Sequence, residues 1–177
     1  DIATTYVEYL KRVIRESLRQ GITFDGFFMV DDVAGTRGML FSPETWRRIY
    51  KPLVADLGRF LKQQKLDFWV HSCGNGEAIF ADLIECGVQA INPLEAKSGL
   101  NVLQLKEKYG NRLAFYGNID VMQMARSPEA LKAELLAKVT AFPDGGFIYH
   151  SDHSIPPEVD FKRYQYLVQL LNQESAG

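Results

Sequence analysis

The chain has 177 residues, 46% of them hydrophobic and 24% charged, a composition typical of a globular domain with its own core. Its 20 lysines and arginines against 22 aspartates and glutamates give a net charge of −2, which argues against a nucleic-acid partner. No apolar run approaches the ~20 residues that span a bilayer, and no signal-peptide pattern opens the sequence, so we expect no membrane segment.

Segments with helical periodicity alternate with short apolar segments along the whole chain. Apolar residues recur at helical spacing from Tyr6 to Leu18, and Gly21 follows as a stop signal. Further helices are expected to begin after Ser42, Asn101 and Ser127, whose side chains suit the N-cap position. We expect helices over 6–18, 43–60, 77–85, 102–109, 128–140 and 161–171, and strands over 24–32, 67–71, 88–95, 112–120 and 145–153.

Five strands that are each followed by a helix predict an α/β fold with a parallel sheet. Two architectures fit this order. One is an open, doubly wound sheet, and the other is the last five units of an eight-unit barrel. The alternation alone slightly favours the open sheet, because that fold needs no further units. Both place the functional site at the carboxyl ends of the strands.

Polar side chains that suit a shared site gather at these strand ends, and all three histidines of the chain are among them. His71 and Cys73 are two residues apart, so both side chains are expected on one face. Imidazole nitrogen and thiolate sulfur are ligands that zinc prefers, although a packed cysteine beside a hydrogen-bonded histidine fits equally. The polar residues at the strand ends are Asp31, Asp32, His71, Cys73, Asn92, Glu95, Asn118, Asp120, His150, Asp152 and His153.

The second cysteine, Cys86, falls in a helical segment and is expected to be a small core residue. That helix would carry it away from Cys73 at ~1.5 Å per residue, beyond the ~7 Å between Cα atoms that a disulfide allows. Both thiols are therefore expected to be free, which is typical of a cytoplasmic protein.

Four segments together resemble the uroporphyrinogen decarboxylase superfamily, which contains the haem-pathway decarboxylase and cobalamin-dependent methyltransferases. The resemblance implies a (β/α)8 barrel, with residues 1–177 as a single domain from its C-terminal part and the earlier units outside this sequence. An open barrel would expose strand edges and core, so we expect self-association or a partner. The segments are D-D-V-A-G-T-R-G-M-L-F-S-P-E, H-S-C-G-N-G-E-A-I-F-A-D-L-I-E-C-G-V-Q-A-I-N-P-L, Y-G-N-R-L-A-F-Y-G-N-I-D and H-S-D-H-S-I-P-P-E.

The methyltransferase branch of the superfamily binds zinc through His-x-Cys and a later Cys. His71 and Cys73 match the pair, and His153 stands where the third ligand would be. This branch implies zinc as cofactor, methylcobalamin or another corrinoid as methyl donor, and a small molecule or a corrinoid protein as substrate. Asn118 and Asp120 lie in a turn that resembles the family's Gly-Asn-Leu-Asp, which implies substrate contacts for them. Substrate contacts are also expected from strand-end residues whose other roles stay open: Asp31 or Asp32 could instead orient a ligand histidine, Glu95 could be an acid or a ligand, and His150 and Asp152 are the next candidates for the third ligand after His153.

Two alternatives to the methyltransferase remain open. The decarboxylases place a histidine at the position of His153 for substrate contact and need no metal, so uroporphyrinogen decarboxylation is the second enzyme hypothesis. A chain that lacks the first barrel units is also compatible with a non-catalytic module that binds a corrinoid or another ligand.

Overall fold

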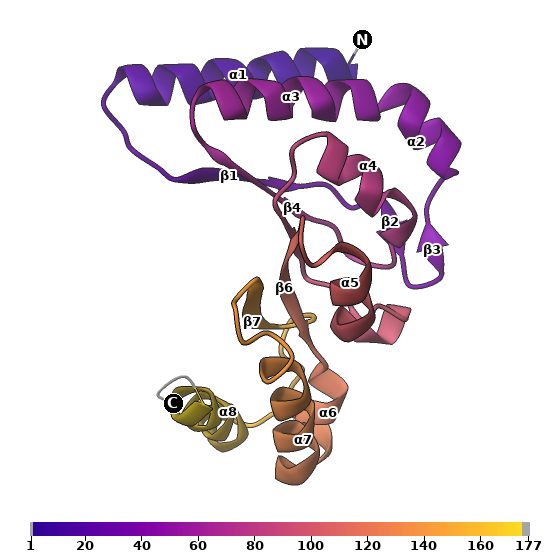
Figure 1. Ribbon diagram of the computed structural model, residues 1–177, viewed down its shortest axis with the longest axis vertical. Helices are drawn as coiled ribbons and strands as arrows, with labels where there is room; N and C mark the ends of the chain where they lie inside the picture. Colours follow the sequence, from indigo (N-terminus) through magenta and orange to yellow (C-terminus); the bar gives the residue numbers. More distant parts are fainter. Residues whose placement is uncertain (1, 175–177) are drawn as a thin grey trace.

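A sheet of five parallel strands forms the centre of the computed structural model, which describes residues 2–174 (Figure 1). The strands lie side by side in the same order as in the chain. They are β1 (Gly26–Val30), β4 (Asp67–His71), β5 (Ala90–Asn92), β6 (Ala114–Ile119) and β7 (Phe147–Ser151).

This sequential order is that of consecutive barrel units. A doubly wound sheet reverses its order at a switch point, so that an early strand lies between later ones. The slight preference for an open sheet was therefore wrong, and the barrel-type fold is confirmed. The alternation of strands and helices could not decide the matter, because it does not encode which strands pair.

The helices and two short strands connect these five strands. The helices are α1 (Ile2–Arg19), α2 (Pro43–Ile49), α3 (Lys51–Gln63), α4 (Phe80–Glu85), α5 (Val102–Tyr109), α6 (Val121–Arg126), α7 (Pro128–Val139) and α8 (Phe161–Glu174), with 3-10 turns η1 (Glu77–Ile79) and η2 (Ala96–Ser98). A small antiparallel hairpin follows β1 and is made of β2 (Ala34–Gly35) and β3 (Gly38–Met39).

The helices cover only one face of the sheet. Phe68 and Phe115 point to that face and are buried in the main hydrophobic core. Phe28 and Val30 point to the other face, where they are 44% and 68% exposed. Because successive side chains of a strand alternate between faces, the uncovered face corresponds to the interior of a barrel.

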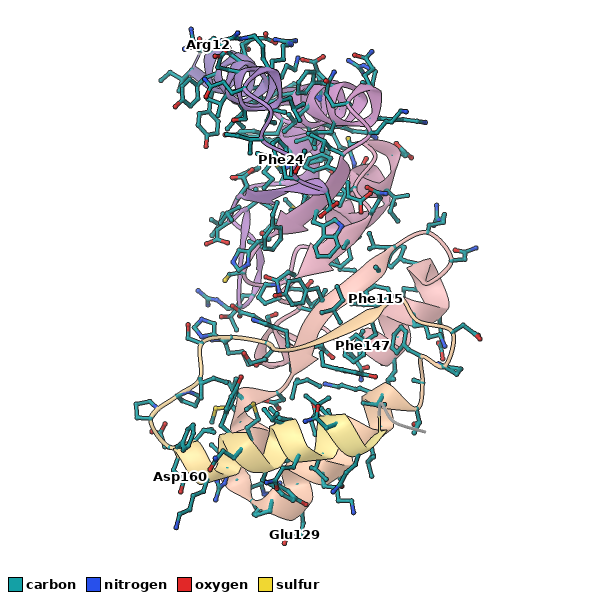
Figure 2. The ribbon with its side chains drawn as sticks, turned by 90° about the vertical axis from the view of Figure 1, so that its left-hand side faces the viewer. Arg12, Phe24, Phe115, Glu129, Phe147 and Asp160 are labelled. Carbon is teal, nitrogen blue, oxygen red and sulfur yellow. The ribbon has the colours of Figure 1, made fainter. Side chains whose placement is uncertain are left out.

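Two hydrophobic clusters hold the helices to the sheet. The larger one surrounds β1, β4 and β5, and the smaller one lies among α6, α7 and α8. Phe147 of β7 packs against both, and Figure 2 shows it beside Phe115, its partner in the strand register. The smaller cluster consists of Ile119, Val121, Met124, Leu131, Leu135, Val159, Leu167 and Leu170.

The predicted helix starts are confirmed at the three caps. The side chains of Ser42, Asn101 and Ser127 accept hydrogen bonds from backbone N–H groups two or three residues ahead. The predicted helix over 43–60 is instead two helices that meet at Tyr50. Pro52 causes this break, because it has no N–H to continue the hydrogen-bond ladder of the preceding turn.

Two short elements were missed by the sequence analysis. Helix α6 has six residues, capped by Asp120, which is too short for a clear periodic pattern. The β2–β3 hairpin has strands of two residues each. None of the helices in the part of the chain from 2 to 174 is long and apolar enough to cross a membrane.

Candidate metal centre

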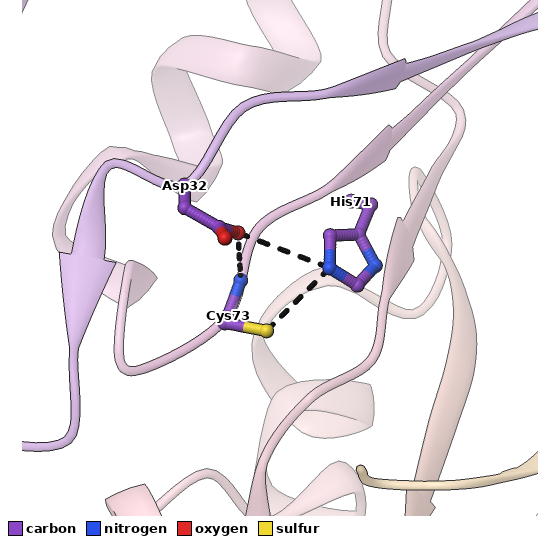
Figure 3. Close-up of side chains that lie close together, drawn as sticks. All are labelled: Asp32, His71 and Cys73. Atoms are coloured by element: carbon purple, nitrogen blue, oxygen red, sulfur yellow. Dashed lines mark hydrogen bonds and ion pairs between the residues drawn. The ribbon is translucent and has the colours of Figure 1, made fainter. Parts of the chain in front are cut away.

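His71 and Cys73 converge at the carboxyl end of β4. The Sγ atom of Cys73 lies 3.5 Å from Nε2 of His71 (Figure 3). Asp32 approaches the same point from the end of β1, with Oδ1 3.8 Å from that imidazole nitrogen. The chain therefore brings a nitrogen, a sulfur and an oxygen ligand atom together from two neighbouring strands.

Asn92 of β5 determines which ring nitrogen of His71 carries the proton. Its Nδ2 donates to the carbonyl of Tyr116 at 3.0 Å, which leaves Oδ1 facing the ring. Oδ1 lies 2.6 Å from Nδ1 of His71, so Nδ1 must carry the proton and donate it. The lone pair is then on Nε2, the atom that faces Cys73 and Asp32. Metal-binding histidines are typically oriented by an oxygen acceptor at the other ring nitrogen, and here the amide oxygen of Asn92 occupies that position.

The loop that carries Cys73 is held by the segment after β1. The backbone N–H of Cys73 donates to Oδ1 of Asp32 at 2.8 Å. Gly74 has φ +78, and a Cβ on it would lie 2.5 Å from the carbonyl oxygen of Gly35. Only glycine fits this close approach of two loops, which explains the residue that follows Cys73.

Cys73 also belongs to a second group of ligand atoms. Glu95, from the loop after β5, and His153, from the segment after β7, each place a ligand atom within 4.8 Å of the other and of the cysteine. Asp32, His71 and Cys73 form the first group by the same measure. The predicted set of His71, Cys73 and His153 is thus divided: among residues 2–174, no such group contains both histidines.

The surroundings of Cys73 favour the protonated thiol. Burial, the negative charge of Asp32 and a hydrogen bond to Glu95 raise the pKa of Cys73 to about 11, while Lys97 acts in the opposite direction. At neutral pH the thiol of this metal-free arrangement is therefore neutral. A bound divalent cation would reverse this balance, because it stabilises thiolate directly.

Three of the predicted substrate contacts serve the fold in this structure. Asn118 is fully buried; its Oδ1 accepts from Val102 N–H, and its Nδ2 donates to the carbonyls of Leu94 and Leu100. Asp152 is also buried, with both oxygens accepting backbone N–H groups. Asp120 caps α6 through Met122 N–H at 2.8 Å. Any contact of these side chains with substrate remains a prediction.

The remaining candidates lie in different environments. His150 is exposed on the uncovered face of the sheet, its ring 4.8 Å from that of Tyr116. Asp31 borders the apolar interior with Trp46 and Val70, and this desolvation together with the charge of Asp32 raises the pKa of its carboxyl group. Asp31 and Asp32 therefore point to different surroundings, as their alternation along the chain predicted.

The sequence analysis missed the contribution of Asn92. Asn92 was among the polar residues expected at the strand ends but had no role assigned to it, because an asparagine there is also an ordinary turn residue. The signal that identifies it is the register, in which Asn92 pairs with His71 across β4 and β5.

Comparison with known proteins identifies the relatives of this fold and site. The family model described as "Uroporphyrinogen decarboxylase (URO-D)" matches residues 2–173. The chain belongs to the uroporphyrinogen decarboxylase family. The resemblance of the four segments is thereby confirmed.

Curated members of the uroporphyrinogen decarboxylase family match over most of the chain. The uroporphyrinogen decarboxylase of Xanthomonas axonopodis pv. citri (strain 306) is 24% identical over 149 residues, which cover 78% of this chain and 41% of the relative. That of Chlorobium phaeovibrioides (strain DSM 265 / 1930) is 28% identical over 140 residues, covering 76% and 39%. The chain thus spans about two fifths of the length of these relatives.

A solved structure of a named methyltransferase has the same fold. The methyltransferase from Methanosarcina mazei superposes with a TM-score of 0.66 at 21% identity, covering 86% of this chain and 43% of that protein. This likeness supports the barrel-type arrangement of the five strands in the present chain.

Proposed function

We propose that this chain carries the zinc site of a methyltransferase that transfers a methyl group from a corrinoid to a thiol. The observation that supports this proposal is the position of His71. Its Nε2, freed by the bond between Nδ1 and Asn92, faces the sulfur of Cys73 at 3.5 Å. Asp32 brings a third ligand atom to the same imidazole nitrogen, which a packed cysteine beside a hydrogen-bonded histidine would not require.

The ligand atoms of Asp32, His71 and Cys73 suit zinc. Zinc bonds of ~2.0 Å to nitrogen and ~2.3 Å to sulfur, in tetrahedral geometry, separate two ligands by about 3.3–3.8 Å. The 3.5 Å between Nε2 of His71 and Sγ of Cys73 matches the ~3.5 Å expected for a nitrogen and a sulfur ligand. The 3.8 Å between Nε2 and Oδ1 of Asp32 is about 0.5 Å wider than the ~3.3 Å expected for a nitrogen and an oxygen ligand, so the carboxylate would move inward on binding. Three protein ligands leave one position open, which is the pattern of catalytic zinc sites. When bound there, zinc lowers the pKa of a substrate thiol and so supplies the thiolate nucleophile.

The residues of the chain prepare this site in the absence of substrate. Asn92 holds the imidazole in one tautomer, and Asp32 fixes the backbone of Cys73 while its carboxylate faces His71. These contacts reduce the reorganisation that metal binding would otherwise require. The substrate would be a small thiol or a corrinoid protein. The free thiols of Cys73 and Cys86 favour a cytoplasmic location.

A decarboxylase is the second candidate, since the curated relatives described above are named uroporphyrinogen decarboxylases. That activity would not depend on Cys73. A binding module without catalysis is the third, because the chain spans only about two fifths of those relatives. These hypotheses differ in whether zinc binds and in whether the sulfur of Cys73 matters.

The decisive experiment compares the chain with its Cys73→Ser and Cys86→Ser variants. Zinc content is measured after purification, and methyl transfer from methylcobalamin to mercaptoethanol is followed. We expect Cys73→Ser to lose zinc and transfer, and buried Cys86→Ser to keep both, although each variant loses one sulfur. Zinc binding without transfer would favour the binding module. Full zinc in Cys73→Ser would contradict the proposed site and favour the decarboxylase.

A further inference from the structure

Three aromatic side chains stand close together on the uncovered face of the sheet. Phe28, Trp69 and Tyr116 come from β1, β4 and β6, and Ala90 of β5, the register partner of Trp69, leaves room for the outer rings to meet. The ring centroids are 6.4 Å apart for Phe28 and Trp69, 6.2 Å for Phe28 and Tyr116, and 6.1 Å for Trp69 and Tyr116. They form a nearly equilateral triangle. A group above its centre can lie within ~6 Å of all three centroids, the distance at which an aromatic ring attracts a cation.

A hollow of about 310 Å³ opens beside these rings at the amino ends of the strands. This aromatic hollow is lined by the three rings and by Asp25, Gly26 and Asp67. Gly26 pairs with Asp67 in the strand register, and a Cβ on Gly26 would lie 2.9 Å from Cβ of Asp67. The missing side chain of Gly26 therefore helps to keep the hollow open. Its volume falls in the ~300–1,000 Å³ range of small-molecule sites, and it lies at the opposite end of the strands from His71 and Cys73.

Two carboxylates border the aromatic hollow without a cation of their own. Within residues 2–174, the ion pairs of the chain include neither Asp25 nor Asp67. Oδ1 of Asp67 accepts a hydrogen bond at 3.1 Å from the neutral amide of Gln89, which holds this carboxylate in place. The arginines and lysines that lie over aromatic rings in the same part of the chain use other rings.

The lining determines the kind of ligand that fits. A metal ion such as Mg²⁺ or Ca²⁺ needs six or more oxygen ligands, and the three rings offer almost none. A neutral apolar molecule would use the rings and leave the two negative charges uncompensated. A cation with an apolar surface uses both, because ring faces attract positive charge and the carboxylates add to that attraction.

We propose that the aromatic hollow binds a small organic cation of the quaternary ammonium class. Such a cation has no N–H group to donate, so its charge is stabilised by ring faces and by nearby carboxylates rather than by hydrogen bonds. The inference is independent of the proposed zinc site, because His71 and Cys73 do not line the hollow.

The test is calorimetric titration of the chain with choline and with its uncharged analogue, in which a tert-butyl group replaces the trimethylammonium group. The two probes have nearly the same shape and differ in charge. We expect choline to bind at least tenfold more tightly than the analogue. The affinity for choline should fall as salt is added, whereas that for the analogue should not.

Variants identify the groups responsible. Trp69→Leu should weaken choline binding roughly 2–30-fold, and Trp69→Phe, which keeps a ring, should weaken it less. Asp67→Asn retains the oxygen that faces Gln89; it should weaken choline and leave the uncharged analogue unchanged, a difference that general damage would not produce. Tyr164→Leu is the matched control, because Tyr164 is an aromatic residue of α8 with 44% exposure and should not affect either probe. Circular dichroism confirms that each variant is folded.

Three results would overturn the inference. The first is no choline binding up to ~10 mM in the unmodified chain. The second is equal affinity for choline and the analogue, which would show an apolar surface without selection for charge. The third is a dimer in sedimentation that Trp69→Leu dissociates, which would make this face an interface between copies of the chain. The comparison of the two probes needs no variant, so it decides the matter even if Trp69→Leu fails to fold.

Discussion

Replacing Asn92 with alanine tests whether Asn92 orients the imidazole of His71 for metal binding. The side chain of Asn92 is buried, and it bridges Nδ1 of His71 and the carbonyl of Tyr116. Asn92→Ala removes both bonds and leaves one donor and one acceptor unsatisfied, each at a cost of about 1–3 kcal/mol. The loss should therefore be about 2–6 kcal/mol, a large part of the ~5–15 kcal/mol that stabilises a typical domain.

The same substitution should weaken metal binding. Loss of a group that orients a metal-bound histidine typically lowers affinity by about 10–100-fold. Urea unfolding of the metal-free chain gives the stability, and competition with a chromophoric chelator gives the zinc affinity. Asn92→Asp is the matched control, because it keeps an oxygen facing Nδ1 of His71 and should retain most of the affinity. If folded Asn92→Ala binds zinc as tightly as the unmodified chain, the orienting role of Asn92 is wrong.

Two further predictions concern pH and packing. The pKa of Cys73 is raised to about 11, against 9.0 for a free thiol, so between pH 9 and pH 11 the folded chain keeps a proton that the unfolded chain loses. The free energy of unfolding of the metal-free protein should therefore fall from about pH 9 to pH 11, and less steeply in Cys73→Ser, as measured by urea unfolding at each pH. An equal slope in Cys73→Ser would show that this thiol is not perturbed. A Cβ at position 58 would lie 1.8 Å from the carbonyl oxygen of Cys86, so Gly58→Ala should cost about 1–3 kcal/mol in thermal unfolding despite the helix preference for alanine. Gly35→Ala, whose added Cβ would meet only Leu40 at 3.7 Å, should change little, and an equal loss in both variants would contradict the steric argument.

The sequence was sufficient for features that depend on local chemistry. Helix starts at Ser42, Asn101 and Ser127 follow from the capping side chain alone, and the structure confirms them. The approach of His71 to Cys73 also followed, since two residues separate them at a strand end. Strand order did not follow, because it depends on contacts between segments far apart in the chain.

The partition of the candidate site also depends on long-range geometry. Curvature of the sheet and the paths of the loops place Glu95, rather than His71, beside His153. Likewise, nothing in the strand-end pattern distinguishes a carboxylate that faces a site from one such as Asp152, whose two oxygens accept hydrogen bonds from backbone N–H groups. Burial and hydrogen-bond partners make that distinction, and both emerge only in the folded chain.

The central claim is that the sulfur of Cys73 binds metal, and X-ray absorption at the zinc edge of the loaded chain tests it most directly. The account predicts a sulfur neighbour at about 2.3 Å together with nitrogen or oxygen neighbours at about 2.0–2.1 Å, and loss of the sulfur signal in Cys73→Ser but not in Cys86→Ser. A first shell of nitrogen and oxygen alone in the unmodified chain would contradict it.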